Sequence, residues 1–182
     1  MVVMGEAASV TGTGEPTDRP SVHPVAPSFE DFFQAEQLRL KRALYLVTGN
    51  SQEAEELTQD AFLALWEKWD RVSVMDEPTG YLYRTAMNRH RSKARRIARA
   101  AKRVAGTAET GDAFAAADER DAVARALARL SPRQRAAVIL TEMLGYGAED
   151  AAGILGVQPP TVRSLASQGR AAMREVLNDD RS

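Results

Sequence analysis

Nine basic side chains are concentrated in a single segment of this chain. The stretch GYLYRTAMNRHRSKARR, residues 80–96, continues to Arg103 without meeting an acidic residue. Its cationic residues are Arg84, Arg89, Arg91, Lys93, Arg95, Arg96, Arg99, Lys102 and Arg103. Clusters of this kind neutralise phosphate groups, which supplies most of a protein's electrostatic affinity for nucleic acid. A solvated helix face is the alternative interpretation, but such faces usually interleave acidic residues at i,i+4.

The element that must position these charges is predicted to be an amphipathic helix. Projected at about 100° per residue, one face carries mostly small and apolar side chains. These are Tyr83, Ala86, Met87, His90, Ala94, Ile97, Ala101 and Val104. A second face carries Arg84, Asn88, Arg91, Arg95, Arg99 and Lys102. We therefore expect the first face to pack in a domain, with His90 as a packed histidine rather than a ligand, and the second to meet phosphates.

The segment before this helix has the opposite charge. Residues 28–77 contain eleven acidic and five basic side chains, although the whole chain has a formal net charge of only -1. Ser28 is expected to cap a first helix, and Ser51 opens a second whose apolar stripe runs from Ala54 to Trp69. Trp66 and Trp69 are both expected in the core. An acidic helix of this kind suits docking onto a basic protein partner.

A second pattern with a defined use is AEDAAGILGVQPPTVRSLAS, residues 148–167. Ala152, Gly156, Val162 and Leu165 stand where a helix-turn-helix needs a small crossing residue, a turning glycine and two packed apolar side chains. An αα-hairpin that never touches DNA is the alternative. The polar candidates for base and phosphate contacts are Gln158, Thr161, Arg163, Ser164, Ser167, Gln168 and Arg170.

Composition and patterning predict an all-α protein with two small helical domains. We expect a disordered tail at 1–27, a three-helix domain at 28–105, a flexible linker at 106–120 and a four-helix domain at 121–178. The absence of cysteine excludes disulfides and thiolate metal sites. With two histidines and no phosphate-cradling glycine loop, neither an enzyme nor a cofactor or metal site is expected. No apolar run approaches the roughly 18 residues of a membrane span, which favours a cytoplasmic protein.

Taken together, residues 28–177 resemble the extracytoplasmic-function (ECF) family of bacterial RNA polymerase sigma factors. The segment AEELTQDAFLALWEKW, residues 54–69, is similar to the family's AEDLVQETFLRLW, which docks on core polymerase. The resemblance implies a three-helix region 2 and a four-helix region 4, with the β and β′ polymerase subunits and promoter DNA as partners. It implies core-polymerase contacts at Glu56, Leu57, Gln59, Asp60 and Phe62. Inhibition by an anti-sigma factor is common in the family.

The basic segment resembles the part of region 2 that meets the promoter -10 element. Residues 77–96 follow the family's P-x-x-W-L-x-x-I-A-x-N-x-x-x-D-x-x-R pattern, with Tyr81 in place of tryptophan and Ser92 in place of aspartate. The implied -10 residues are Tyr81, Arg84, Asn88, Arg91, Lys93, Arg95 and Arg96. The loop from Arg71 to Gly80 is expected to shape a pocket for a flipped base.

The C-terminal half resembles region 4, which meets the -35 element. LARLSPRQRAAVIL, residues 127–140, is similar to the family's lead-in A-L-x-x-L-P-x-x-x-R-x-V-x-x-L. In the second helix of the motif, Leu165 and Gln168 replace two arginines of the family pattern and Gly169 replaces alanine. The other candidate function is a helix-turn-helix regulator that binds duplex DNA without joining polymerase.

Overall fold

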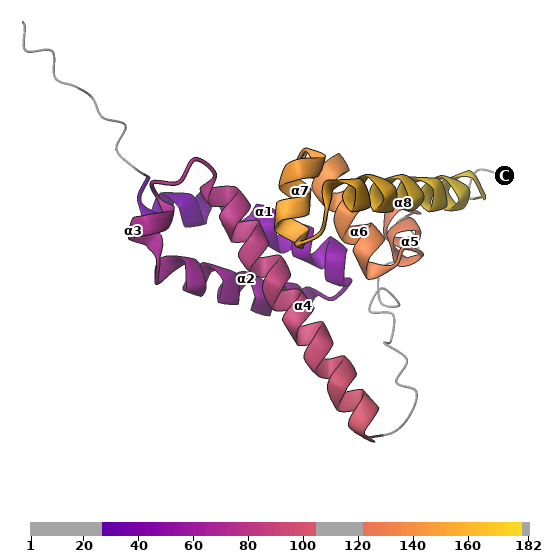
Figure 1. Cartoon of the computed structure of the whole chain (residues 1–182), viewed down its shortest axis with the longest axis horizontal. Coiled ribbons are helices and arrows are strands. Elements are labelled where there is room, and N and C mark those ends of the chain that lie inside the picture. The colour runs from indigo at the N-terminus through magenta and orange to yellow at the C-terminus, as the bar shows by residue number, and fades with distance from the viewer. Residues whose placement is uncertain (1–26, 105–121, 180–182) are drawn as a thin grey trace, which may run out of the picture.

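The computed structural model describes residues 27–104 and 122–179, and within these residues every regular element is helical. The N-terminal half contains α1 (Phe29–Thr48), α2 (Ser51–Trp66), α3 (Trp69–Val72) and α4 (Pro78–Val104). The C-terminal half contains α5 (Ala122–Ala128), α6 (Pro132–Val138), a π-helical turn η2 (Ile139–Met143), α7 (Ala148–Leu155) and α8 (Pro159–Asp179) (Figure 1). The expected linker and nearly all of the expected N-terminal tail lie outside the described residues. The all-helical, two-domain prediction is confirmed.

Helix ends lie where local chemistry places them. The hydroxyl of Ser28 accepts a hydrogen bond from the backbone N–H of Asp31 (3.1 Å), which caps α1. Gly49 ends α1 with a φ of 72°, in the left-handed region that favours glycine. Ser131 and Gln134 form a reciprocal capping box at the start of α6.

The expected loop at residues 71–80 is shorter than the sequence suggested. Arg71 and Val72 belong to α3, and α4 already begins at Pro78 rather than near Gly80. Val72 is buried, so the single turn of α3 is held by the core. Proline is favoured in the first turn of a helix because its missing N–H has no partner there, which accounts for the early start of α4.

An aromatic cluster fills one end of the N-terminal domain. The ring of Trp69 packs on Phe29 and Phe32, with ring centroids 5.4 and 5.0 Å apart, and Phe62 lies 4.8 Å from Phe33. The prediction that Trp69 packs in the core is confirmed, although its side chain stays partly exposed. The same prediction for Trp66 is wrong, because this residue is 61% exposed. Trp66 follows the buried Leu65 by one residue and so lies about 100° around α2 from the core.

The helix-turn-helix is formed as expected. Gly156 ends α7 with a φ of 62°, and Ala152 of α7 and Val162 of α8 are both buried. Leu165 is half-buried against the same core. These contacts hold α8 across α7, which is the geometry that presents the second helix of the motif.

The two domains pack against each other. Helix α7 lies against α4, and one apolar core continues from the N-terminal helices into α6, α7 and α8 (Figure 1). The ring of Tyr83 on α4 meets that of Tyr146, just before α7, edge to face with centroids 5.9 Å apart. Arg135 of α6 donates from Nη1 to the carbonyl of Val47 in α1 (3.2 Å). No pattern in the sequence indicates this contact between domains.

The packing face expected along all of α4 is buried only in its first half. Tyr83, Ala86 and Met87 are in the core, whereas Ala94 and Ile97 are exposed, Ile97 by 50%. Beyond Ala94 the helix projects from the body of the molecule (Figure 1). Among the described residues, no helix has the length and hydropathy to cross a membrane.

Gly169 of α8 gives a test of how the C-terminal core is packed. A Cβ at this position would lie 2.6 Å from Cγ2 of Val138, a stiff, buried side chain that has no room to retreat. Although alanine favours a helix by up to about 1 kcal/mol over glycine, we expect Gly169→Ala to lower the free energy of unfolding by about 1–2 kcal/mol through overpacking.

In a Val138→Ala background the same substitution has space, so its cost should shrink or change sign. Urea denaturation of the four chains of this double-mutant cycle measures the difference. Equal effects of Gly169→Ala in both backgrounds would contradict the packing described.

Candidate nucleic-acid interface

One edge of α4 is neutralised by α2. Lys93 bonds to Glu56 (2.8 Å), Arg89 lies 3.6 Å from Asp60, and His90 Nδ1 is 3.3 Å from Glu53. The hydrogen bond with His90 is the main reason why the pKa of Glu53 is lowered from its usual value. His90 is thus half-buried and paired with an acid, rather than simply packed among apolar side chains. These pairs hold α4 against α2 and withdraw two cations from the phosphate-binding set.

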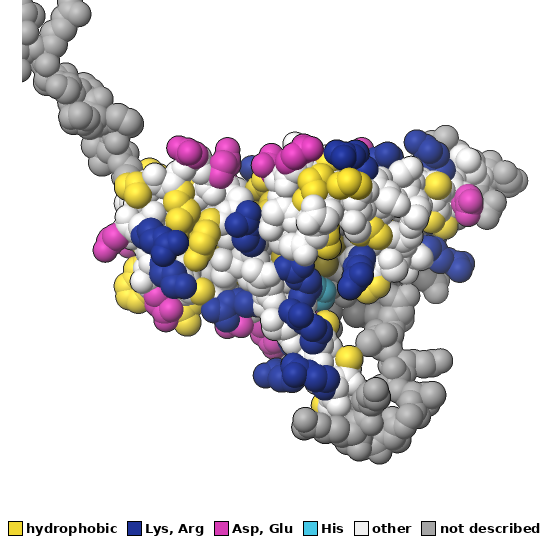
Figure 2. Space-filling view, viewed as in Figure 1, with side chains coloured by type: hydrophobic (Ala, Val, Ile, Leu, Met, Phe, Trp, Pro, Cys, Tyr) yellow, Lys and Arg dark blue, Asp and Glu magenta, His cyan; other side chains and the backbone are white. Residues whose placement is uncertain are grey.

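The other cations of α4 have no acidic partner among the described residues. Arg95 and Arg99 donate from Nε to the carbonyls of Arg91 (3.4 Å) and Arg95 (3.2 Å), so their side chains lie back along the helix. Lys and Arg side chains follow α4 onto its projecting half (Figure 2). Among the described residues, the cations of α4 that have no acidic partner are Arg84, Arg91, Arg95, Arg96 and Arg99.

Arg91 is half-buried, whereas the other cations of α4 without an acidic partner, Arg84, Arg95, Arg96 and Arg99, are exposed. Desolvation lowers the pKa of Arg91, and the nearby charges of Arg95 and Arg133 act in the same direction. Its guanidinium also donates to the side-chain oxygen of Asn88 one turn earlier. Arg95 and Arg133 face the same side as Arg91 without a compensating acid, so an anion placed there would relieve repulsion among three cations.

Tyr81 and Asn88 lie around the same shallow hollow. This depression of about 320 Å³ is formed between the end of α2 and the first half of α4. Its lining residues are Ala64, Lys68, Tyr81, Thr85, Asn88, Arg89 and Ser92. An aromatic ring and an amide around one depression are groups that can stack on a base and bond to it, and Lys68 adds a cation for its phosphate. The hollow is built by helices, and the loop at residues 71–80, which is expected to shape a pocket for a flipped base, does not line it.

The expected polymerase-docking residues divide into two groups. Glu56, Gln59 and Asp60 are exposed on α2, whereas Leu57 and Phe62 are buried in the core beneath them. Two large apolar residues that the sequence analysis did not select, Leu63 and Trp66, are 57% and 61% exposed. Gln59, Leu63 and Trp66 have the spacing i, i+4, i+7 and therefore share one helix face. This face is displaced from the buried stripe of α2. The spacing of Leu63 and Trp66 in the sequence is therefore the signal that could have identified them as exposed residues of the docking face.

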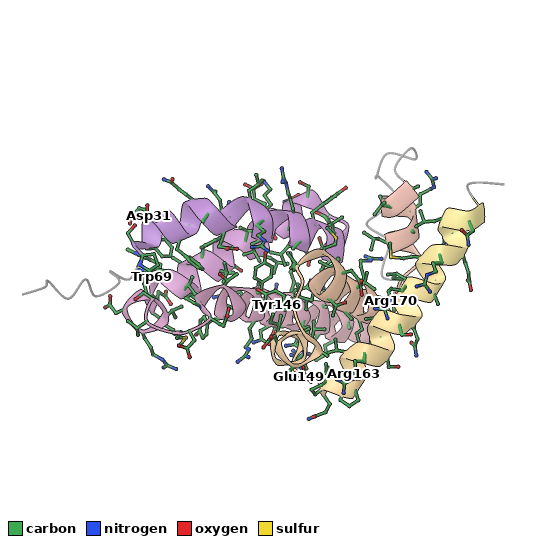
Figure 3. All side chains as sticks on the ribbon, turned by 90° about the horizontal axis from the view of Figure 1, so that it is seen from above. Asp31, Trp69, Tyr146, Glu149, Arg163 and Arg170 are labelled. Atoms are coloured by element: carbon green, nitrogen blue, oxygen red, sulfur yellow. The ribbon has the colours of Figure 1, made fainter. Side chains whose placement is uncertain are left out.

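The candidate DNA residues of α8, together with Gln158 just before it, are on the accessible side of the helix-turn-helix. Gln158, Thr161, Arg163, Ser164, Ser167 and Gln168 are exposed, and Arg170 is half-buried. Both arginines meet acids: Arg163 lies 3.5 Å from Glu149 and Arg170 lies 2.6 Å from Glu142 (Figure 3). Gln168 accepts a hydrogen bond from Gln134 (3.2 Å). This helix therefore offers polar side chains but little unneutralised positive charge.

Two protein families match the chain in the order of its domains. "Sigma-70 region 2" matches residues 32–100, and "Sigma-70, region 4" matches residues 120–173. The chain is 30% identical over 156 residues to the ECF RNA polymerase sigma factor SigM of Mycobacterium tuberculosis, covering 82% of this chain and 77% of that protein. It is 30% identical over 158 residues to RNA polymerase sigma factor CarQ of Myxococcus xanthus, covering 84% and 90% respectively.

Solved structures agree with the fold. The sigma factor RpoE from Bartonella quintana, in complex with the anti-sigma factor NepR, superposes with a TM-score of 0.70 at 25% identity, covering 82% of this chain and 96% of that chain. CnrH, in complex with the cytosolic domain of CnrY, has the same fold, with a TM-score of 0.57 at 22% identity and coverage of 84% and 88%. With regions 2 and 4 in sequence and the same arrangement of helices, this chain belongs to the ECF family of RNA polymerase sigma factors, which direct transcription initiation and are not enzymes.

Proposed function

We propose that this chain binds core RNA polymerase through α2 and promoter DNA through α4 and α8, and that it acts in the cytoplasm, where these partners are. The functional units would be residues 28–105 for polymerase and the -10 element, 106–120 as linker and 121–178 for the -35 element. The observation that carries the proposal is the pairing of an acidic, partly apolar face on α2 with an acid-free row of arginines on α4. One face suits a protein partner and the other suits phosphates.

At the -10 element, Arg84, Arg91, Arg95 and Arg96 would hold the backbone of the strand that separates. Tyr81 and Asn88 would receive a base in the hollow between α2 and α4, where a stacked base contributes roughly 1–3 kcal/mol. Lys93, which is bonded to Glu56, would contribute to DNA binding only after exchanging that partner. Capturing unpaired bases in this way favours an open promoter over the closed duplex.

At the -35 element, α8 would enter the major groove with Thr161, Ser164 and Ser167 toward base edges. Arg163 and Arg170 would reach phosphates by exchanging Glu149 and Glu142 for them. Since each exchange must replace an existing ion pair, region 4 would add sequence preference more than electrostatic affinity.

A helix-turn-helix regulator that never joins polymerase would have no use for Leu63 and Trp66 exposed beside Gln59 and Asp60. One of the related structures, that of RpoE, is a complex with the anti-sigma factor NepR. We propose that this chain is likewise held by an anti-sigma protein. In vitro transcription with core polymerase on genomic fragments, with mapping of start sites, tests the central proposal. Absence of any specific initiation would reject it.

Asp60 gives the first specific test. Asp60→Lys replaces an exposed carboxylate of the docking face and sets a second cation beside Arg89, so polymerase binding should weaken by about tenfold or more. A pull-down with core polymerase measures this. Glu55→Lys makes the same charge change on another face of α2, where Glu55 pairs with Lys41, and should leave polymerase binding nearly unchanged. Equal binding by the Asp60→Lys chain and the original chain would exclude this docking surface.

Arg91 and Arg95 give the second test. Reversing both charges, with Arg91→Glu and Arg95→Glu, should abolish promoter opening because two phosphate contacts become repulsive. Polymerase binding should persist, since neither residue lies on the docking face of α2. Permanganate footprinting of the unpaired strand and a polymerase pull-down separate the two effects. Arg39→Glu with Arg42→Glu on α1 is the matched control, and loss of both activities in the α4 variant would indicate a purely structural role.

Trp66 and Trp69 form a matched pair for the third test. Trp66→Ala should reduce polymerase affinity by about tenfold, as exposed tryptophans at interfaces often do, while changing the free energy of unfolding by less than about 0.5 kcal/mol. Trp69→Ala should instead cost about 2 kcal/mol or more of stability, because its ring packs on Phe29 and Phe32. Urea denaturation and polymerase binding are measured for both, and a stability loss in Trp66→Ala would contradict its exposure.

A further inference from the structure

A cavity of about 400 Å³ lies where α4 passes the C-terminal domain. Helix α4 forms one wall, and the start of α6 with the turn between α7 and α8 forms the other. Most of its lining is apolar, and the side chains that provide this surface include Met87, Ala94, Ala136, Leu155, Val157 and Leu165. A cavity of this size, with apolar walls and a few convergent polar groups, is typical of sites for small molecules.

The charged side chains around this cavity are all cationic. Arg91 and Arg95 line it from α4 and Arg133 lines it from α6, and none of the lining residues that the structure describes is acidic. Lys and Arg side chains gather where α4 meets the C-terminal domain (Figure 2). His90 also lines the cavity, but it is already paired with Glu53 at 3.3 Å. Within residues 27–104 and 122–179, none of the three arginines forms an ion pair with an acid.

Arg91 shows most directly that an anion is missing from this group of cations. Desolvation, and then repulsion from Arg95 and Arg133, lower the pKa of Arg91. Its Nε is buried without a hydrogen-bond partner, and its guanidinium rests against Gly156, where a Cβ would lie 3.0 Å from Nη1. Protein contacts therefore hold this charge at the edge of the cavity, and an anion placed there would lower the electrostatic cost of holding it.

Contact with promoter DNA would account for the arginines but not for the apolar walls. A backbone phosphate needs cations on an open surface and gains nothing from Leu155, Val157 or Leu165. An apolar group placed between these side chains would be removed from water, which is favourable in proportion to its apolar area. Apolar walls combined with unpaired arginines therefore fit a molecule that has both an apolar body and an anionic head.

The number of arginines indicates which anion suits the cavity. A carboxylate carries one negative charge, whereas a phosphate monoester carries about −1.5 to −2 near pH 7 and offers three acceptor oxygens. Three guanidiniums that repel one another are neutralised better by the phosphate, which arginine also meets in bidentate geometry. A volume of about 400 Å³ is near the lower end for small-molecule sites, so the apolar body must be compact.

We propose that this cavity binds a small phosphate monoester that carries a compact alkyl or aryl group. The phosphate is held by Arg91, Arg95 and Arg133, and the apolar group lies against Leu155 and Val157. The site goes beyond the proposed function, because binding requires neither polymerase nor promoter and is measured on the chain alone.

Isothermal titration calorimetry of the full chain with octyl phosphate, below the concentration at which it forms micelles, tests the site. Inorganic phosphate supplies the head alone, octyl glucoside supplies the tail on a neutral head, and octanoate supplies a head of single charge. Octyl phosphate should bind one-to-one and at least about tenfold more tightly than each of these. Equal binding of octyl glucoside or of inorganic phosphate would show that one half of the site is not used and would overturn the proposal. Equal binding of octanoate would overturn the assignment of a phosphate head.

Two pairs of variants test the residues of the site. Arg133→Gln should weaken octyl phosphate binding by about tenfold, because one charged hydrogen-bond donor is lost. Arg174→Gln makes the same charge change at an exposed position of α8 that does not line the cavity, and should leave binding unchanged. Ala94→Phe places a ring in the cavity and should abolish measurable binding, whereas Ala98→Phe, one turn further along α4, should not. Binding by Arg133→Gln and Ala94→Phe at the level of their controls would overturn the proposal.

Methionine methyl groups locate the bound octyl phosphate. Met87 lines the cavity, whereas Met143 is 56% exposed on η2 and does not line it. In methyl NMR spectra of the methionine-labelled chain, octyl phosphate should shift the Met87 resonance at concentrations that leave Met143 unchanged. A shift of Met143 without one of Met87 would place the ligand elsewhere and overturn the proposal. Circular dichroism checks that each variant folds, and if Arg133→Gln does not, the comparison of Ala94→Phe with Ala98→Phe decides the outcome.

Discussion

A single buried guanidinium joins the two domains of this molecule. Arg135 is buried, and it donates hydrogen bonds to the carbonyls of Leu127 (2.9 Å), Leu130 (3.2 Å) and Ala128 (3.4 Å) at the end of α5 and beyond it, and to Val47 (3.2 Å) in the last turn of α1. A buried charge is costly without such partners, and the carbonyl ends of helices are the negative ends of their dipoles. Three of these bonds fix α5 and α6 within the C-terminal domain. The fourth extends the same group to the N-terminal domain, so domain folding and domain docking depend on one side chain.

The distribution of surface charge depends on a second constraint. Helix α4 must form ion pairs with α2, and some of its cations must remain without an acidic partner. Glu53, Glu56 and Asp60 meet His90, Lys93 and Arg89 along one edge, and the arginines on the remaining surface of α4 meet no acid among the described residues. The half-exposed pairs contribute little stability individually, because water and salt screen them. The rotation of α4 is set by its buried face, with Tyr83, Ala86 and Met87 in the core, and this rotation brings the acids of α2 beside Arg89, His90 and Lys93. A near-neutral chain can therefore present a basic surface.

Local features of the sequence predicted most of this architecture. Ser28 and Gly156 mark helix ends as expected, and Gly49 and Ser131 do the same through interactions with residues three or four positions away. The predictions that failed depend on contacts between residues that are far apart in the sequence. The pattern of α4 is amphipathic to its end, but whether a face is covered depends on what lies opposite, and nothing covers Ala94 or Ile97 fully. Trp66 is exposed because it lies about 100° around α2 from the buried Leu65, and a large apolar side chain does not by itself show which face is covered. Docking of the domains depends on contacts such as Tyr83 with Tyr146, which no periodicity within a helix can show.

Two glycines inside helices show how the chain balances helix stability against contact. At Gly169 the absent Cβ makes room for Val138 within one domain, and at Gly153 it makes room for Arg84 across the domain contact. Glycine in either position weakens its helix by a comparable amount, so the helix alone explains neither. The first serves a contact that every form of the domain needs. The second serves the contact between the two domains. At each position the glycine is explained by the side chain that packs against it, so contacts far apart in the sequence set which residue the helix carries. The neighbouring unpaired polar atoms of Tyr83 and Arg91 limit how tightly the domain contact holds.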